Sequence, residues 1–354
     1  MEGVGEAAAV VAAEVALGPI SGFDVPLVSV REQPDTVGGR LSRFWDAWQE
    51  LRLNAFVREV VQHGHSIPFL DGPPPTSGIR VTEGSRQRLS VLREEVAGLL
   101  AKGAVERVPE QEIGRGWYST YFLVPKKTGD WRPILNLKPL NKLVDVEPFK
   151  METLANVILT CAPGEWLASL DLKDAYFHVS VRHSHRRFLR FCLGGVHYQY
   201  RVLPFGLSTS PRVFTKVLAP VVESLRLEGI HIHPYLDDLL LRADSKEHLA
   251  WSVDRAVYAL NKVGFIVNWA KSEPRPVKDL VFIDGHFRTD LGRVFLPHDR
   301  TTALITVVQS FQTGRYKEAR VWLKLLGVMA ASIQVVPYAR LRMRPIQLYF
   351  LSRW

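Results

Sequence analysis

The stretch "GIHIHPYLDDLLLRAD", residues 229–244, decides the fold because two adjacent carboxylates interrupt an otherwise apolar run. Alternating apolar residues precede Asp237 and Asp238, and a run of leucines follows them. This pattern predicts two short strands with charge at the turn between them. Neighbouring residues on a strand point to opposite faces, and burying an unpaired carboxylate is costly. The pair therefore predicts either a cation site or, as the simpler alternative, an Asp-rich hairpin turn.

A second carboxylate stands in a similar setting about sixty residues earlier. In "EWLASLDLKDAYFHV", Asp171 ends an apolar run that begins at Trp166. Two strand-end carboxylates that meet at one sheet edge would hold two divalent cations about 4 Å apart, as an in-line phosphoryl displacement requires. Hard oxygen ligands favour Mg²⁺, with Mn²⁺ as a possible substitute. No Cys or His cluster at zinc spacing competes with this interpretation.

The order of motifs resembles that of a retroelement reverse transcriptase. A basic segment similar to the fingers motif comes first, and four stretches similar to motifs A to D follow it: "YFLVPKKTGDWRPILNLKPLNKLV", "SLDLKDAYFHV", "YRVLPFGLSTSPRVFTKVL", "PYLDDLLL" and "GFIVNWAKSE". Phrases such as "PFKMETL" are most similar to DIRS-type retrotransposons, with gypsy-type elements next. The similarity runs from about residue 41 to the C-terminus.

The resemblance implies an α+β right-hand polymerase fold whose palm is built on an antiparallel sheet. It implies a leader over residues 1–40, a helix and connector over 41–80, fingers and palm over 81–290, and a thumb or connection segment over 291–354. The implied activity is RNA-directed DNA polymerase, with an RNA template, a DNA primer or RNA–DNA hybrid, and dNTPs as partners. The alternatives are a decayed or domesticated copy that binds nucleic acid without polymerising, and a structural subunit of a retroelement particle.

The same resemblance assigns roles to individual residues. Asp171, Asp237 and Asp238 are the expected catalytic carboxylates, and they would hold the metal together with the Leu172 carbonyl. The expected nucleotide-binding residues are Lys126, Lys127, Arg132, Asp174, Ala175, Tyr176, Phe205, Gly206 and Lys271. Lys271 is the candidate general acid. The expected primer grip contains Phe282, Gly285 and His286.

Several of these residues also have simpler interpretations. In isolation Tyr176 would be a core tyrosine, and the basic hairpin tip "KKTGDWR" would be a solvated loop. Two residues depart from the family pattern. Asp284 replaces the usual leucine of the primer grip, and Pro234 is easiest to accommodate on an edge strand because it lacks an N–H.

Charge and cysteine content agree with an intracellular nucleic-acid partner. The net charge is +9; residues 1–40 carry −4, which leaves +13 for the remainder. A basic body suits a phosphate backbone, although a solvated basic surface gives the same total. Two cysteines predict reduced thiols in the cytoplasm or nucleus. No apolar run is long enough to span a membrane, and the acidic residues in the leader argue against a signal peptide.

Turn and cap signals give a coarse secondary structure. Helices are expected over about 43–64, over 85–103, from Ser210 onward with a kink or early end at Pro220, and over 245–264. A hairpin is expected around Gly194-Gly195. Relatives in this family often carry a ribonuclease H domain. Beyond Asp299 the sequence holds one acidic residue, Glu318, so no RNA cleavage by this chain is expected.

Overall fold

A run of short helices replaces the single helix expected over residues 43–64. The computed structural model describes residues 36–125, 131–311 and 317–354. In it, a 3-10 helix (Arg40–Phe44) leads into α1 (Trp45–Gln49), and α2 (Ala55–His63) follows after a break. The break occurs because the Asn54 side chain caps α2, accepting the Val57 N–H at 2.9 Å. As predicted, the helix ends at Gly64, which has a positive φ of 85°.

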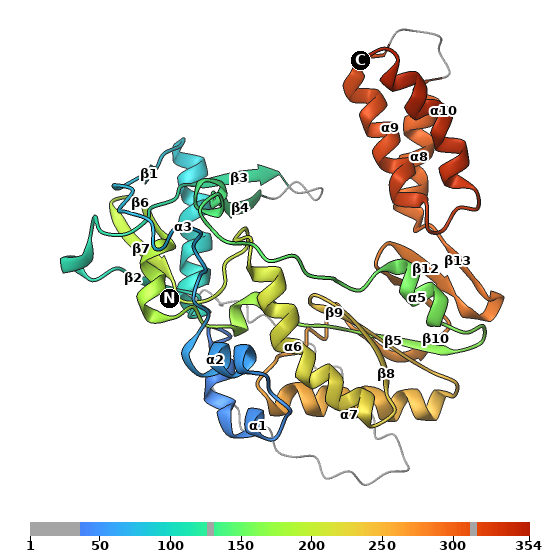
Figure 1. Ribbon diagram of the computed structural model, residues 1–354, viewed down its shortest axis with the longest axis horizontal. Helices are drawn as coiled ribbons and strands as arrows, with labels where there is room; N and C mark the ends of the chain where they lie inside the picture. Colours follow the sequence, from blue (N-terminus) through green and yellow to red (C-terminus); the bar gives the residue numbers. More distant parts are fainter. Residues whose placement is uncertain (1–35, 126–130, 312–316) are drawn as a thin grey trace, which may run out of the picture. The chain divides into compact units, whose positions relative to one another are not determined.

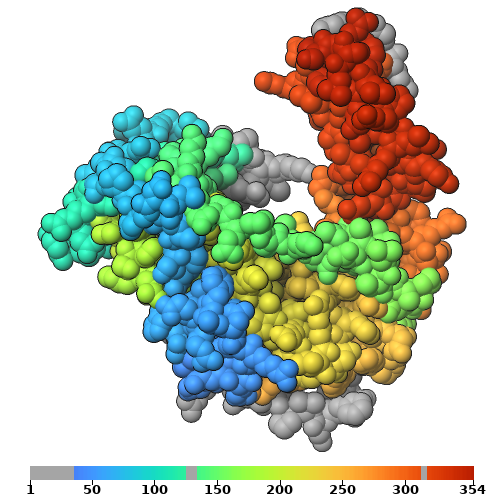
Figure 2. Space-filling model, viewed as in Figure 1, coloured from blue at the N-terminus to red at the C-terminus, as the bar shows by residue number. Residues whose placement is uncertain are grey.

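These N-terminal helices are part of the protein core. Trp48 is fully buried, and its indole N–H donates to the Val263 carbonyl at 2.9 Å. Its ring meets Phe265 edge to face at 6.1 Å. In the space-filling view the helices, in blue, lie against the yellow and orange elements that contain residues 210–270 (Figure 2). Residues 36–64 therefore support the region that carries motifs B to D.

The first sheet belongs to the part that resembles fingers. Its strand order is β1-β6-β7-β2, with β1 (Val81–Thr82), β6 (Arg190–Leu193), β7 (Val196–Tyr200) and β2 (Val105–Arg107). Helix α3 (Arg86–Ala101) packs on it and is capped by Ser85, close to the predicted bounds. Gly194 and Gly195 form the predicted two-residue turn with φ of 58° and 79°. A second hairpin pairs β3 (Tyr121–Pro125) with β4 (Trp131–Leu135), and the short helix α4 (Lys138–Asn141) follows.

The palm sheet is antiparallel throughout and carries the motif carboxylates. Its order is β10-β5-β9-β8, with β10 (Glu273–Val277), β5 (Trp166–Asp171), β9 (Asp238–Ala243) and β8 (His231–Tyr235). Helices α6 (Ser210–Leu227) and α7 (Lys246–Lys262) pack against it (Figure 1). The two strands and the charged turn predicted from residues 229–244 are therefore confirmed. Strand β8 lies at the sheet edge, where Pro234 was expected to fit.

Both faces of the palm sheet are covered, which explains the unbroken leucine run after Asp238. Leu239 and Leu241 belong to the main core. Leu240 points to a second core with Leu167 of the neighbouring strand. A strand that is buried on both faces reads as a continuous apolar run rather than an alternating one. Burial on both faces thus holds β9 in place, and Asp238 begins this strand at the end of the sheet.

The second core lies under a small three-stranded sheet. This sheet has the order β11-β12-β13, with β11 (Asp279–Phe282), β12 (Gly285–Arg288) and β13 (Arg293–Phe295). Helix α5 (Leu154–Thr160) contributes Leu154 and Val157 to the same core. Helices α8 (His298–Gln309), α9 (Ala319–Ser332) and α10 (Ala339–Leu351) then pack in succession, each against the next.

Two further expectations have clear outcomes. The chain stays helical through Pro220 to Leu227, so the predicted early end of α6 is wrong; a long apolar face on α6 is buried along the helix. Cys161 and Cys192 are both free thiols, as predicted. Within residues 36–125, 131–311 and 317–354, no helix combines the length and apolar composition needed to cross a membrane.

Two buried histidines predict acid sensitivity of the fold. His178 is fully buried; its Nε2 accepts the Ile266 N–H at 3.1 Å, and its Nδ1 donates to the Ala175 carbonyl at 3.1 Å. Burial lowers its pKa from 6.5 to about 3, and burial, His185 and Arg212 lower the pKa of His65 to about 4. Below pH 6.5 the unfolded chain therefore binds protons that the folded chain does not. The two histidines should therefore lower stability by about 3 kcal/mol as pH drops from 6.5 to 5, and the raised pKa of Asp238 offsets part of this loss.

Urea unfolding at pH 7 and pH 5 measures this difference. Replacing His65 by Gln should remove about half of it, whereas His183→Gln should leave it unchanged because His183 is exposed. Equal stability at the two pH values would contradict the assignment of both buried histidines as neutral.

Candidate functional site

The sheet register brings the motif carboxylates together at one end of the palm sheet, where β5 ends and β9 begins. Asp171 ends β5 and lies directly opposite Asp238, which begins β9. Residues directly opposite each other in an antiparallel pair project to the same face, so these two carboxylates are neighbours. Asp237 occupies the turn immediately before Asp238, and its carbonyl accepts the Leu172 N–H at 2.8 Å. The predicted set of Asp171, Leu172, Asp237 and Asp238 is thus placed at a single locus.

The turn that carries Asp237 is tight and strained. Tyr235 pairs with Asp238, so Leu236 and Asp237 alone connect β8 to β9. Leu236 has a φ of 54°, in the left-handed region that residues with a side chain rarely adopt. Such conformations cost about 1–3 kcal/mol and persist where the surrounding structure fixes them. Here the two-sided burial of β9 and the Leu172–Asp237 hydrogen bond hold the turn in place.

Asp171 is held by the segment that resembles motif D. Only Lys271 of this segment was predicted to belong to the site. The Asn268 side chain donates to Asp171 Oδ1 at 2.8 Å, and the Asn268 N–H donates to the Asp171 carbonyl at 2.7 Å. The Asp171 N–H donates to Ser272 Oγ at 3.0 Å. Lys271 Nζ lies 3.8 Å from Asp171 Oδ2 and is 69% exposed. The predicted residue Lys271 is therefore at the site, and Asn268 and Ser272 were missed.

The electrostatics of the carboxylates favour a cation. Burial is the main cause that raises the pKa of Asp237, with the charge of Asp171 adding to it. Burial, followed by the charges of Asp237 and Asp171, raises the pKa of Asp238 to about 6. Lys271 opposes both shifts, but less strongly. A cation among these oxygens would relieve the mutual repulsion.

The donor chemistry fits Mg²⁺, although the protein does not form a closed cage. Among the residues that the structure describes, no group of three or more His, Cys, Asp or Glu side chains is gathered closely enough to hold a metal ion, and this includes the three motif carboxylates. Mg²⁺ commonly binds through one or two carboxylates and takes its remaining ligands from water and substrate phosphates. Asp171, Asp237 and Asp238 provide hard oxygen ligands of that kind at one sheet edge.

The residues expected to contact the nucleotide follow Asp171 directly. Asp174 has a φ of 49°. Its Oδ1 accepts a hydrogen bond from Lys102 Nζ at 2.9 Å, and the sequence did not predict this partner. Ala175 and Tyr176 begin the following 3-10 helix and are buried. The Tyr176 ring packs against Phe205 at 5.1 Å and Phe214 at 5.7 Å. Tyr176 is therefore a core residue, and it is also close enough to Asp237 and Tyr235 for their charges to raise its pKa.

The loop at Phe205-Gly206 completes this side of the site. Phe205 is 58% exposed, although its ring touches Tyr176. Gly206 has a φ of 95°, which explains the glycine. Asn141 holds the loop in two places: its amide donates to the Gly206 carbonyl at 2.8 Å, and its oxygen accepts the Ser208 N–H at 3.0 Å. No sequence pattern indicates this role of Asn141.

Three further predicted nucleotide-binding residues fall within residues 126–132 of the sequence. Lys126 and Lys127 fall outside the described residues. Arg132 lies in β4, where its backbone pairs with Val124. The expected primer-grip residues Phe282, Gly285 and His286 are placed on β11 and β12. His286 contacts Asp279 across this hairpin at 2.5 Å.

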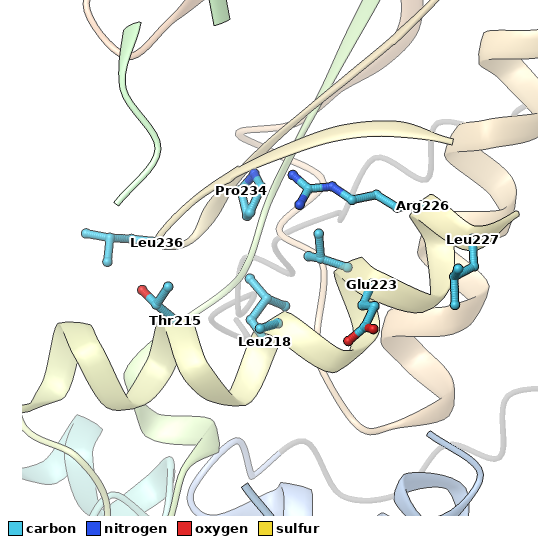
Figure 3. Close-up of a pocket in the computed structure, with 9 residues that line it drawn as sticks. Thr215, Leu218, Glu223, Arg226, Leu227, Pro234 and Leu236 are labelled. Atoms are coloured by element: carbon cyan, nitrogen blue, oxygen red, sulfur yellow. The ribbon is translucent and has the colours of Figure 1, made fainter. Parts of the chain in front are cut away.

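A separate apolar pocket lies beside the turn between β8 and β9. It has a volume of about 440 Å³ and opens between α6 and β8 (Figure 3). Leu218, Glu223 and Leu227 of α6 are among the residues that line it, together with Pro234 and Leu236, and the Arg226 side chain points toward Pro234. None of the motif carboxylates lines it, so this pocket is distinct from the candidate site.

An antiparallel palm sheet with carboxylates on a central hairpin turn places this protein among the polymerases of right-hand architecture. Residues 124–279 match the family described as reverse transcriptase (RNA-dependent DNA polymerase). Residues 124–279 are therefore similar to a reverse transcriptase domain, and the relatives that share this similarity are retroviral and retrotransposon polyproteins. This confirms the family resemblance, whereas the DIRS-type assignment stays a prediction.

Relatives come from retroviruses and a yeast transposon. The chain is 31% identical over 192 residues to the Gag-Pol polyprotein of Rous sarcoma virus subgroup B (strain Schmidt-Ruppin), covering 49% of this chain and 12% of the polyprotein. It is 30% identical over 219 residues to the Transposon Tf2-3 polyprotein of Schizosaccharomyces pombe, covering 62% and 15%. The chain thus spans less than a sixth of the length of these curated relatives.

A solved structure shares the fold. A foamy viral protease-reverse transcriptase, determined in complex with double-stranded DNA, superposes with a TM-score of 0.66 at 14% sequence identity. The match covers 86% of this chain and 54% of the viral one. At this identity the match supports the expected α+β polymerase-like fold and nothing finer.

Proposed function

We propose that this chain is an RNA-directed DNA polymerase that adds deoxynucleotides to a primer 3′ end. The observation that carries the proposal is the register that sets Asp171 opposite Asp238, with Asp237 in the adjoining turn. RNA template, a DNA primer or RNA–DNA hybrid, and dNTPs are the proposed partners. In this scheme residues 81–290 are the fingers and palm, and residues 291–354 begin a thumb or connection segment.

Asp171, Asp237 and Asp238 would hold two Mg²⁺ ions together with the Leu172 carbonyl. When bound, such ions stabilise the attacking and leaving oxygens of an in-line phosphoryl displacement. The primer 3′-oxygen forms a bond to the α-phosphorus of the dNTP, and the bond to the pyrophosphate oxygen breaks. Asn268 and Ser272 fix Asp171 throughout, because they bond to its side chain and backbone.

The remaining predicted residues position the nucleotide and handle the proton. Lys271 Nζ, exposed beside Asp171, is the proposed donor of a proton to the leaving pyrophosphate. Arg132, Lys126 and Lys127 are proposed to contact the triphosphate, since cations on a hairpin suit phosphate oxygens. Asp174, Ala175, Phe205 and Gly206 would lie around the nucleotide, with the Tyr176 ring against its sugar.

Primer extension on poly(rA)/oligo(dT) with Mg²⁺ tests the proposal directly. We expect extension that needs the divalent ion and stops when EDTA is added. Substituting Mn²⁺ should support activity, because both ions accept oxygen ligands. A folded protein that binds the template–primer but extends nothing with either ion would contradict the proposed function.

Template–primer affinity should fall steeply with salt. Residues 41–354 carry a net charge of +13, and we expect part of it to contact phosphates. Each neutralised phosphate contributes a log–log slope of about −0.9 on duplex DNA and about −0.7 on single strands. Fluorescence anisotropy between low and physiological salt measures this slope. A slope near zero would show that the basic surface does not face the nucleic acid.

A further inference from the structure

The tip of the β11–β12 hairpin is an unusual turn for its sequence. Phe282 pairs with Gly285, so Ile283 and Asp284 alone form the turn. Both have positive φ, 44° and 60°. Such turns favour Asn and Gly, and a β-branched residue there is strained. A contact outside the turn is therefore expected to help hold it.

Arg300 supplies that contact from the first turn of α8. Its Nε lies 3.1 Å from Asp284 Oδ1, and its Nη2 lies 2.8 Å from both carboxylate oxygens. This is the planar fork arrangement that gives arginine–carboxylate pairs their geometric specificity. The two side chains are about half-exposed, at 48% and 56%. Asp284, the departure from the family pattern, thus has a dedicated partner.

The other side of the hairpin is fixed to the palm. A Cβ on Gly285 would lie 2.5 Å from Leu154 Cδ1, so the hairpin approaches α5 as closely as a glycine permits. Phe282 and Phe287 are buried in the second core together with Leu240 of β9. The hairpin is therefore tied to the strand that begins with catalytic Asp238.

Helices α8–α10 contribute a basic surface. They contain six Arg or Lys residues and one acidic residue, Asp299. Beside the Asp284–Arg300 pair, a cavity of about 280 Å³ opens between α8 and α9, lined by Leu304 and Val328 among others. Apolar contact at this point is thus incomplete, so a directional ion pair has more influence on where α8 begins.

We propose that Asp284 and Arg300 form an ionic latch that positions the basic helices α8–α10 for the template–primer. The latch joins two parts of the protein. One is the β11–β12 hairpin, which packs against β9, and the other is helices α8–α10, which would lie along the template–primer duplex. It retains the duplex between additions and takes no part in the chemical step. This inference rests on the proposed function, and both members are positioning residues.

The variant Asp284→Asn distinguishes the loss of the latch from the effect of charge alone on nucleic-acid binding. Removing a carboxylate from a nucleic-acid-binding face should, by charge alone, tighten binding. The latch predicts the opposite: faster dissociation from the template–primer and shorter products per binding event in the presence of a heparin trap. Since exposed ion pairs contribute modestly, we expect a loss of roughly two- to fivefold.

Three further variants complete the cycle. Arg300→Gln should shorten products by a similar or larger factor, because it also removes a positive charge. The double variant Asp284→Asn/Arg300→Gln should be no worse than Arg300→Gln. The exchanged pair Asp284→Arg/Arg300→Asp should restore products to within about twofold of wild type. Arg255→Gln is the matched control, since it breaks the ion pair between Arg255 of α7 and Glu228 at the C-terminal end of α6.

Longer products or slower dissociation in Asp284→Asn would overturn the latch. The ion pair would then serve only to mask the positive charge of Arg300. Failure of the exchanged pair to recover would do the same. Dissociation is also measured without dNTPs, using a fluorescent template–primer. A wild-type protein that binds but does not extend would therefore refute the proposed function while the latch is still tested.

Discussion

Asp237→Asn is expected to reduce primer extension by at least ~100-fold, comparable to removing a major electrostatic stabiliser from an active site. Asp237 lies in the turn between β8 and β9, next to Asp238 and near Asp171. The substitution keeps the size of the side chain but removes the charge that a bridging metal ligand needs. Initial rates on poly(rA)/oligo(dT) with Mg²⁺ measure the loss.

The fold should survive this change. Burial and the charge of Asp171 raise the pKa of Asp237, so the ionised group destabilises the metal-free protein as pH rises through that pKa. Asparagine cannot ionise, and we expect the Tm at pH 8 without metal to be unchanged or higher.

Asp244→Asn is the matched control, because Asp244 is 88% exposed just beyond the far end of β9. It removes the same charge and should retain full activity. Substantial extension by Asp237→Asn, or an equal loss in Asp244→Asn, would refute the metal assignment.

The sequence predicted the palm well because its signals are local. A strand that ends in Asp171, and an apolar run interrupted by two aspartates, carry their own boundaries within a few residues. Ser85 and Ser245 likewise cap the helices that they were expected to start. Local cap chemistry can also override periodicity, as Asn54 shows by breaking the helix expected over 43–64.

Residues that act across long sequence separations were missed. Lys102 reaches Asp174 from 72 positions away, and Asn141 holds the Gly206 loop from 65 positions away. Neither lies in a pattern that marks a site, since their partners become neighbours only after folding. Asn268 and Ser272 stood next to a predicted lysine, yet spacing alone did not point them at Asp171. Asp284 is a similar case: its partner Arg300 lies on a separate helix.

Tyr176→Ala is expected to raise the use of ribonucleotides relative to deoxyribonucleotides by at least ~10-fold. The Tyr176 ring packs against Phe205 and is close enough to Asp237 and Tyr235 for their charges to affect it, and the sugar of an incoming nucleotide is proposed to rest beside it. Burial, with the charges of Asp237 and Tyr235, raises its pKa to about 12, so the phenol is neutral at working pH. Its expected effect on a 2′-hydroxyl is therefore steric, and removing the ring removes the clash.

The measurement is the ratio of kcat/KM for matched rNTP and dNTP. Tyr176 is only 9% exposed and packs against Phe214, so the alanine variant loses core contacts and Tyr176→Val serves as a milder second test. Tyr176→Phe keeps the ring and should keep wild-type selectivity. Tyr258→Ala, on the exposed side of α7, controls for the loss of a tyrosine elsewhere. An unchanged ratio in both active small variants would make Tyr176 a core residue without a role in sugar selection, because a steric barrier must weaken when the ring is gone.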